Sequence, residues 1–264
     1  MGGGDMNEDA VVAAIDHGLH WGSYDDFADP EATLRTLLEA NVDGLLAGVP
    51  FFRRFRSVIE EYDVHRIATL DLLHNSTIPG RDDGSEIHTQ VFSADAAVEA
   101  GADAAKMALV YGRSDPAVLS KNLEFVGDGA ETCKQVDLPL VVEPTLWGQR
   151  IEDEFNGDML ADAARIASEL GADLLKLPYP GADEFVPIVD HAPVPVYIAG
   201  GPAVENDREV LEMVAGARDA GGRGVMFGRN IWQREDPVAV VDAFRRIIHD
   251  GASVDDAAAI LEGV

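Results

Sequence analysis

The chain has 264 residues, of which 47% are hydrophobic, so it is long and apolar enough to bury a sizeable core. Its 48 acidic and 20 basic residues give a formal net charge of −28, which excludes an electrostatic surface for nucleic acid and argues against binding to anionic membranes. Sixteen of the basic residues are arginine and four are lysine, a balance typical of a protein kept soluble in concentrated salt. We therefore expect a protein of a halophilic cytoplasm, with an ordinary acidic mesophilic protein as the alternative.

The single cysteine, Cys133, cannot form an intramolecular disulfide, which fits a reducing interior. No signal peptide precedes the first expected strand, and no apolar run approaches the length needed to span a membrane. These features predict a cytoplasmic protein. The glycine-rich opening predicts a flexible N-terminal end over residues 1–9.

Short apolar runs alternate with longer amphipathic stretches along the whole chain, which is the signature of repeated βα units. In chain order, the expected strands are Val11–Ile15, Gly44–Ala47, Ile67–Leu70, Ala104–Leu109, Leu140–Glu143, Leu174–Leu177, Val194–Ile198 and Gly224–Phe227. The expected helices between them include Pro30–Ala40, Ala94–Ala100, Leu119–Gln135, Met159–Leu170 and Asp207–Ala220.

Three of the predicted helices end in a similar way, with Gly101, Gly171 and Gly221 placed where a helix C-terminus needs a left-handed residue before a strand. Eight βα units in about 250 residues predict an α/β fold, the (β/α)8 TIM barrel, as one domain over residues 1–264. An open doubly wound sheet is the alternative. It is disfavoured because Asp16-His17-Gly18 follows the first strand in place of a dinucleotide-binding glycine fingerprint.

Two of the four lysines, Lys106 and Lys176, lie inside runs that should be buried strands. A buried ammonium is costly, so such a lysine either pairs with a carboxylate or loses its proton and becomes a nucleophile for carbonyl carbons. A lone lysine would favour the structural ion pair. Glu143 ends the strand between these two, and repulsion between the amines should keep one of them neutral. The pattern therefore favours Schiff-base chemistry, with Glu143 as a proton shuttle.

Glycine-rich turns follow the seventh and eighth expected strands. Gly200 and Gly201 form the first turn, and Gly228 with Arg229 forms the second. Turns at these two positions of a barrel offer backbone N–H groups to a phosphate, and an arginine adds a charge-assisted hydrogen bond. Either pair alone would be read as a tight turn, but both together predict a phosphate site.

Asp16 ends the first strand, where an aspartate either caps the next turn or acts on a substrate. His17 and His20 beside it raise the possibility of zinc binding, because two histidines and an aspartate are common zinc ligands. Two lysines in the same cavity would oppose a cation. We therefore expect neither a metal nor another cofactor.

These segments resemble the DeoC/FbaB/LacD superfamily of class I aldolases, and in particular the archaeal-type (DhnA-like) fructose-bisphosphate aldolases. The most specific matches are Asp16-His17-Gly18, Gly171–Lys176 with Tyr179-Pro180-Gly181, Ala199-Gly200-Gly201-Pro202 and Gly228–Arg234.

The resemblance implies a metal-independent Schiff-base aldolase that cleaves or forms a carbon–carbon bond in a phosphorylated ketose, such as fructose 1,6-bisphosphate, and releases dihydroxyacetone phosphate or a similar ketone. Lys176 is then the Schiff-base lysine, and Asp16 orients or deprotonates substrate hydroxyls. The glycine turns and Arg229, with His17 nearby, hold the phosphate. Proteins of this family usually form homo-oligomers, which we expect here.

The segment after strand five, Glu143–Gly148, lacks the acid/base tyrosine that archaeal aldolases carry there. Lys106 and the strand-five glutamate instead resemble the branch of tagatose-bisphosphate and sulfofructose-phosphate aldolases. Tyr24, Tyr111 and Tyr179 are the candidates to replace the missing tyrosine, and their spacing does not choose among them.

Three other functions remain open at this point. A transaldolase-like synthase of the aminodideoxyheptulosonate type, or a thiolase-like transferase, would share Lys176 and differ in the acceptor. A metal-dependent lyase or hydrolase would use Asp16, His17 and His20. A non-catalytic barrel would bind sugar phosphates as a sensor and leave the two buried lysines unexplained.

Overall fold

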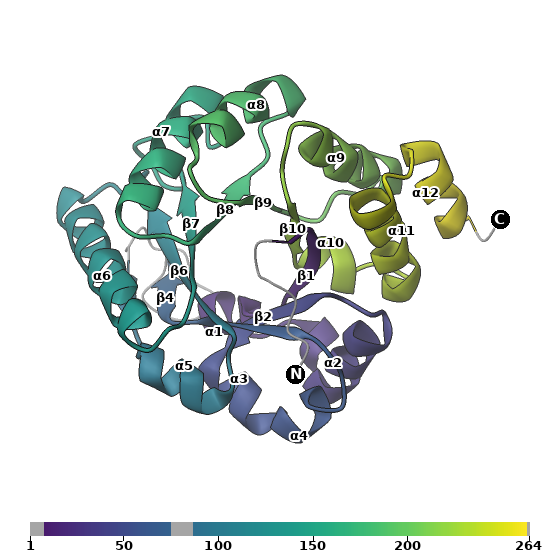
Figure 1. Ribbon diagram of the computed structural model, residues 1–264, viewed down its shortest axis with the longest axis horizontal. Coiled ribbons are helices and arrows are strands. Elements are labelled where there is room, and N and C mark those ends of the chain that lie inside the picture. Colours follow the sequence, from purple (N-terminus) through teal and green to yellow (C-terminus); the bar gives the residue numbers. More distant parts are fainter. Residues whose placement is uncertain (1–7, 75–86, 263–264) are drawn as a thin grey trace.

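The computed structural model describes residues 8–74 and 87–262, and its centre is a closed barrel of parallel strands (Figure 1). Around the barrel the strand order is β1-β10-β9-β8-β7-β6-β3-β2. The strands are β1 (Ala10–Ala14), β2 (Gly44–Gly48), β3 (His65–Thr69), β6 (Ala104–Val110), β7 (Leu140–Thr145), β8 (Leu174–Pro178), β9 (Val196–Ala199) and β10 (Gly224–Phe227). Each overlaps one expected apolar run, so the predicted (β/α)8 barrel is confirmed.

Strand β6 shows why the apolar runs located the strands. All seven of its residues are buried, including Lys106, because the barrel interior covers one face and the helices cover the other. Strand β7 extends two residues beyond the expected end at Glu143. The parallel pairing with β6 continues there, with Leu109 opposite Pro144 and Val110 opposite Thr145.

An antiparallel hairpin that the sequence did not predict follows β3. It consists of β4 (Asp71–His74) and β5 (Ile87–Gln90) and forms a separate two-stranded sheet. The chain leaves the barrel after Leu70, whose carbonyl accepts hydrogen bonds from Val91 and Phe92. Asp71, which directly follows the expected strand Ile67–Leu70, therefore begins the hairpin.

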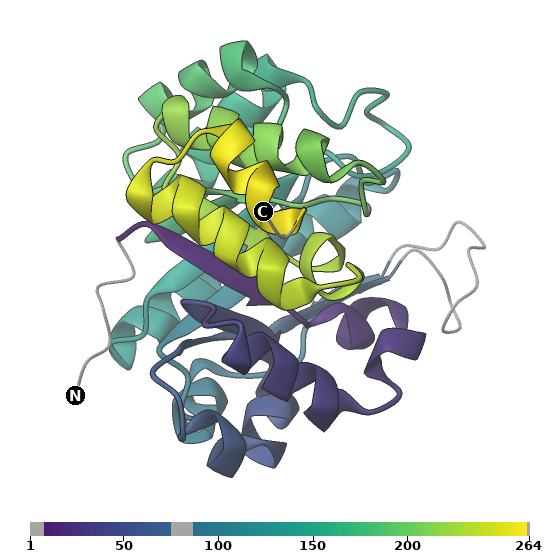
Figure 2. The same cartoon turned by 90° about the vertical axis from the view of Figure 1, so that its right-hand side faces the viewer.

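The helices form a ring outside the strands (Figure 1). They are α2 (Pro30–Glu39), α3 (Val49–Arg54), α4 (Arg56–Ile59), α5 (Ala94–Ala100), α6 (Pro116–Gln135), α7 (Gly157–Glu169), α8 (Ala182–His191), α9 (Asp207–Asp219), α11 (Pro237–Asp250) and α12 (Val254–Leu261). Figure 2 shows α11 lying across the outside of the barrel over β1, with α12 beside it. Three short elements, α1 (His17–Trp21), η1 (Asp25–Phe27) and α10 (Arg229–Trp232), lie in the loops after β1 and β10. Within residues 8–74 and 87–262, every helix is too short or too polar to cross a membrane.

Local signals set the ends of these helices. Helix α6 begins three residues before its expected start because the side chain of Asp115 accepts the N–H of Ala117 and Pro116 occupies the first turn. At the other ends, Gly101, Gly171 and Gly221 have φ values of 83°, 106° and 92°, the positive φ expected of glycine after a helix.

Three aspartates, each directly before a barrel strand, clamp the neighbouring strand at two points. The backbone N–H of each aspartate donates to a carbonyl of that strand, and its Oδ2 accepts the N–H of the same residue. The pairs are Asp43 with Val11, Asp103 with Arg66 and Asp173 with Leu140, with N–H to Oδ2 distances of 2.8, 2.9 and 2.8 Å. These aspartate clamps fix the register of β1 with β2, β3 with β6 and β7 with β8 at the amino ends of the strands.

The N-terminal end is only partly described. Residues 1–7 of the expected flexible end lie outside the described residues. The backbone carbonyl of Glu8 accepts a hydrogen bond from the hydroxyl of Tyr197 inside the barrel (2.5 Å), and the carboxylate of Asp9 pairs with Arg223 at 3.2 Å. These contacts tie the described residues before β1 to β9 and to the residue that precedes β10.

Candidate active site

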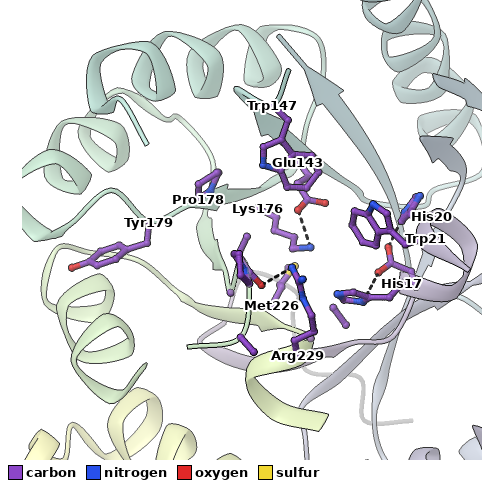
Figure 3. Close-up of a pocket in the computed structure, with 18 of the residues that line it drawn as sticks. His17, His20, Trp21, Glu143, Trp147, Lys176, Pro178, Tyr179, Met226 and Arg229 are labelled. Atoms are coloured by element: carbon purple, nitrogen blue, oxygen red, sulfur yellow. Dashed lines mark hydrogen bonds and ion pairs between the residues drawn. The ribbon is translucent and has the colours of Figure 1, made fainter. Parts of the chain in front are cut away.

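A cavity of about 560 Å³ opens at the carboxyl ends of the strands (Figure 3). Parallel barrels place their chemistry at this end, because the loops that follow the strands converge there. All of the predicted site residues line this one cavity: Asp16, His17, Lys106, Glu143, Lys176, Gly200, Gly201, Gly228 and Arg229.

Three adjacent strands bring the two lysines and the glutamate together. Lys106 lies on β6, Glu143 on β7 and Lys176 on β8, and the three side chains point into the barrel. Glu143 bridges the amines, with Oε2 at 2.7 Å from Lys106 Nζ and Oε1 at 2.9 Å from Lys176 Nζ. The carboxylate lies between the two positive charges, so it offsets the direct repulsion that the sequence led us to expect. We call this group the Lys–Glu–Lys bridge.

The electrostatics of the Lys–Glu–Lys bridge favour the ionised forms of Glu143 and Lys106. Burial raises the pKa of Glu143, but the ammonium groups of Lys106 and Lys176 outweigh it and hold the pKa at about 2. Burial likewise lowers the pKa of Lys106, and the carboxylates of Glu143, Asp16 and Asp71 raise it above its ordinary value. The pKa of Lys106 therefore favours its charged form.

Asp16 forms the other side of the cavity floor. Its Oδ2 accepts a 2.8 Å hydrogen bond from the Thr69 hydroxyl and lies 3.7 Å from Lys106 Nζ and 3.4 Å from His20 Nε2. Burial raises the pKa of Asp16, but Lys106, His20 and Lys176 together bring it well below its ordinary value. Asp16 is thus an ionised hydrogen-bond acceptor facing the cavity. Thr69 was not predicted as its partner.

The predicted phosphate end is assembled from the turns after β9 and β10. Arg229 Nη2 donates to the carbonyl of Gly201 at 3.0 Å, while Nε, also buried, has no hydrogen-bond partner in the part of the chain that the structure describes. Gly228 packs so closely that a Cβ there would lie 2.2 Å from Cε1 of His17. The two turns therefore meet, with a guanidinium between them.

Asn230, which sequence reasoning missed, holds the phosphate end together. It is fully buried, and its amide donates to the carbonyls of Gly200 and Pro202 at 2.7 and 3.1 Å. Its Oδ1 accepts the N–H of Val204 at 2.9 Å. One side chain from α10 thus fixes the path of the turn after β9. Its position directly after Gly228-Arg229 was the available signal.

Known proteins share this architecture. The model of the DeoC/LacD family aldolases matches residues 10–234, which is most of the chain. The chain belongs to the DeoC/LacD family of aldolases. A class 1 fructose-bisphosphate aldolase of Halobacterium salinarum is 36% identical over 254 residues, covering 94% of this chain and 93% of the relative. The predicted family and enzyme class are therefore confirmed.

Two further similarities bear on the chemistry of this aldolase. An archaeal fructose-1,6-bisphosphate aldolase, solved with its catalytic lysine covalently bound to the carbinolamine intermediate of the substrate, matches with a TM-score of 0.81 and 29% identity, over 92% of this chain and 94% of the other. A 2-amino-3,7-dideoxy-D-threo-hept-6-ulosonate synthase of Halobacterium salinarum is 32% identical over 94% of this chain and 90% of its own length.

Of the three tyrosines considered as acid/base groups of this aldolase, Tyr24 and Tyr179 line the cavity. Tyr179 lines its edge, but Figure 3 shows the ring pointing away toward the helices, where it packs 5.4 Å from Phe185. Tyr111 lies outside the cavity lining, and burial raises its pKa to about 12. In the loop after β7, the cavity is lined by Trp147.

His17 and His20 do not form a metal site with Asp16 in this aldolase. Within the described ranges, no three His, Cys, Asp or Glu side chains are grouped to hold a metal ion. His20 Nδ1 faces the N–H of Leu73 at 3.4 Å, and the Lys106 ammonium lies beside Asp16. Burial, with Lys176 and Arg229 nearby, lowers the pKa of His17 to about 4 despite the opposing effect of Asp16. His17 is therefore a neutral group at the phosphate end.

A buried Asp71–His88 pair lies behind Lys106 and was not found from the sequence. Oδ2 of Asp71 contacts Nε2 of His88 at 2.7 Å and accepts the N–H of Ala108 on β6 at 2.8 Å. Burial raises the pKa of Asp71, but His88 and Lys106 bring it below its ordinary value. The pair adds negative charge behind Lys106 and ties the hairpin to the barrel.

Proposed function

We propose that this chain is a class I aldolase in which Lys176 forms a Schiff base with a phosphorylated ketose, such as fructose 1,6-bisphosphate or a related ketose phosphate. The observation that carries the proposal is the Lys–Glu–Lys bridge at the floor of the cavity. A carboxylate 2.9 Å from one amine and 2.7 Å from another can receive a proton from the first while the second stays charged.

Of the two lysines, Lys176 fits the role of nucleophile better. Lys106 has two carboxylates within 4 Å, Glu143 and Asp16, and its pKa is raised, so it remains protonated. Among the described residues, Lys176 contacts one carboxylate, and its side chain is 9% exposed compared with 3% for Lys106. Lys106 then acts as a fixed positive charge that orients substrate oxygens.

Schiff-base formation follows from this arrangement. Glu143 takes a proton from the Lys176 ammonium, and the neutral amine attacks the ketone carbon. The proton that the attacking nitrogen then loses moves to the carbonyl oxygen, which becomes a hydroxyl. Once Lys176 is a neutral carbinolamine nitrogen, Glu143 has lost one of the two cations that lower its pKa, so it can hold a proton. Glu143 then gives that proton to the hydroxyl, water leaves, and an iminium forms.

Bond cleavage uses the iminium as the electron sink. Removal of a proton from the C4 hydroxyl lets the C3–C4 bond break, the aldehyde leaves, and its bonding electrons form an enamine on Lys176. The ionised carboxylate of Asp16 faces this region and can accept the hydroxyl hydrogen bond, and Glu143 can act as the base. Protonation at C3 and hydrolysis of the iminium then release a ketone such as dihydroxyacetone phosphate.

The phosphate of the bound ketone is placed at the turns after β9 and β10. Nε of Arg229 is a buried donor without a partner among the described residues, and a phosphate oxygen would satisfy it. Neutral His17, beside Gly228, can donate one further hydrogen bond.

The test is reductive trapping. The protein is incubated with dihydroxyacetone phosphate and borohydride in concentrated potassium chloride, and the modified peptide is identified by mass spectrometry. We expect one reduced adduct, on Lys176. Lys176→Arg should form none, whereas Lys121→Arg, on the exposed face of α6, should be trapped like the wild type. An adduct on Lys106 would exchange the roles of the two lysines, and no adduct would refute Schiff-base chemistry.

A synthase is the second candidate, favoured by the 32% identity to the aminodideoxyheptulosonate synthase of Halobacterium salinarum. It would share Lys176 but pass the bound enamine to a different acceptor. Product analysis decides between the two functions: release of free aldehyde and ketone from a ketose phosphate supports the lyase, and product formation only with an added acceptor supports the synthase.

We also propose that the protein works in a halophilic cytoplasm and forms homo-oligomers. The net charge of −28 and the excess of arginine over lysine support solubility in concentrated salt, and the free thiol of Cys133 is buried. Val186 on α8 and Val238 on α11 are 42% and 43% exposed on the outer ring, where apolar groups suit contacts between subunits. Light scattering in potassium chloride measures the oligomeric state.

A further inference from the structure

The charges in the cavity balance. Among the described residues that line it, three are acidic and three are basic, which gives a net charge of 3 − 3 = 0 with the histidines neutral. The six are Asp16, Glu143, Glu154, Lys106, Lys176 and Arg229. A substrate with two phosphate groups would bring about four negative charges into this neutral cavity.

Four of these charges neutralise each other at the floor, in the Lys–Glu–Lys bridge and the contact of Lys106 with Asp16. Of the described cationic side chains in the lining, this leaves Arg229 as the one without a carboxylate partner. Arg229 and its two glycine turns hold the phosphate of the ketone half of the substrate, as proposed above.

The other end of the cavity is aromatic and acidic. Trp21 lies between the two ends, with its ring centroid 5.4 Å from that of His17 and 6.4 Å from that of Trp147, and Trp147, Glu154 and Phe155 come from the loop after β7. Figure 3 shows Trp147 and Arg229 on opposite sides of Lys176. Apart from Lys106 and Lys176 at the floor and Arg229, the described lining contains no lysine or arginine, and the loop after β7 adds the carboxylate of Glu154 to it.

A second phosphate would be poorly held there. It would lose part of its hydration without gaining a cation, and the Glu154 carboxylate would repel it. The C–H groups of a sugar chain, by contrast, pack well on indole rings. The sugar hydroxyls can still reach water there, because Trp21 is 40% exposed. The two ends of the cavity therefore suit different parts of one substrate.

We infer that the preferred substrate is a ketose with a single phosphate, next to the ketone, and an uncharged far end that lies on Trp21 and Trp147. This inference rests on the proposed function. Breaking the C3–C4 bond of such a ketose leaves the phosphorylated three-carbon unit on Lys176 and releases an aldehyde without phosphate. The C4 hydroxyl proton goes to the base, and the enamine later takes a proton at C3.

The test compares two substrates that differ in the second phosphate. We expect kcat/KM for cleavage of fructose 1-phosphate to exceed that for fructose 1,6-bisphosphate by at least about tenfold in concentrated potassium chloride. Equal values, or a preference for the bisphosphate, would overturn the inference.

Two variants locate the cause of the preference. Glu154→Gln removes the carboxylate and Glu154→Arg supplies a cation, so the ratio of monophosphate to bisphosphate kcat/KM should fall in two steps. The matched control is Glu124→Arg, which makes the same change of charge on the exposed face of α6 and should leave the ratio unchanged. A ratio that Glu154→Arg does not lower would place the discrimination elsewhere and overturn the inference.

Trapping with dihydroxyacetone phosphate tests the proposed function independently of the single-phosphate inference, because this ketone lacks the far half of the substrate. Trapping on Lys176 together with a preference for the bisphosphate would refute the single-phosphate inference and leave the aldolase function intact. No trapping and no cleavage of either ketose would refute the function itself.

Discussion

Replacing Glu143 with glutamine removes a carboxylate that contacts both buried lysines. In the wild type, the pKa of Glu143 is held at about 2 instead of 4.5. That difference corresponds to about 3 kcal/mol of stabilisation of the ionised folded state. Loss of one member of a buried ion pair costs about 3–5 kcal/mol in general. We therefore expect Glu143→Gln to lower the free energy of unfolding by about 3 kcal/mol at neutral pH.

The lowered pKa of Glu143 also predicts how the effect of Glu143→Gln on stability depends on pH. A carboxyl group whose pKa is lower in the folded than in the unfolded protein contributes stability above pH 4.5, and this contribution is lost as the pH falls toward 2. The difference in unfolding free energy between the wild type and Glu143→Gln should thus be constant from about pH 8 to pH 5 and become smaller below pH 4.5.

The assay is urea unfolding followed by tryptophan fluorescence, in potassium chloride, at several pH values. The control is Glu124→Gln. Glu124 pairs with Lys121 on the surface, and the two side chains are 60% and 64% exposed, so the free energy of unfolding should change by less than about 0.5 kcal/mol. Equal unfolding free energies of the two variants at pH 7 would contradict the prediction. So would a difference between the wild type and Glu143→Gln that does not become smaller in acid. As a separate readout, kcat of Glu143→Gln should fall by about 100-fold or more, because a proton shuttle is lost.

Three further predictions concern the remaining parts of the site. Lys176→Arg should lower kcat by at least about 1,000-fold with an unchanged unfolding curve, because guanidinium cannot form the Schiff base; residual turnover near the wild-type rate would refute the assignment. Arg229→Ala should raise KM for a ketose phosphate about 10- to 100-fold, with partial recovery in Arg229→Lys; an unchanged KM would remove the phosphate from this end. Asn230→Ala should cost about 2 kcal/mol of unfolding free energy, because it leaves buried carbonyls unsatisfied, and should also raise KM; a stable variant with normal KM would show that the turn after β9 keeps its path without Asn230.

The barrel could be predicted from the sequence because its strands are buried on both faces. Such strands appear as short apolar runs, and a glycine after a helix marks the end of the preceding unit. The hairpin of β4 and β5 escaped prediction for the opposite reason. Of the two leucines of β4, only Leu73 is buried. The register of the hairpin depends on pairing between residues well separated in the chain, such as Asp71 and Gln90, and not on a local sequence pattern.

The site was predictable to the extent that strand ends determine it. Lys106, Glu143 and Lys176 lie on adjacent strands, so the fold alone brings them together. Thr69 and Asn230 could not be assigned in this way, because their roles depend on which side chain or turn lies opposite them in space. Tyr179 shows the same limit: it directly follows β8, yet its ring packs away from the cavity.

The aspartate clamps lie at the opposite end of the barrel from the cavity. Asp43, Asp103 and Asp173 hold the strands in register through backbone groups, and none of them lines the cavity. The residues that keep the barrel closed and those that select the substrate are therefore separate sets. A lineage of such enzymes can exchange Trp147 or Glu154 and explore new aldehydes while the closure of its scaffold is inherited unchanged.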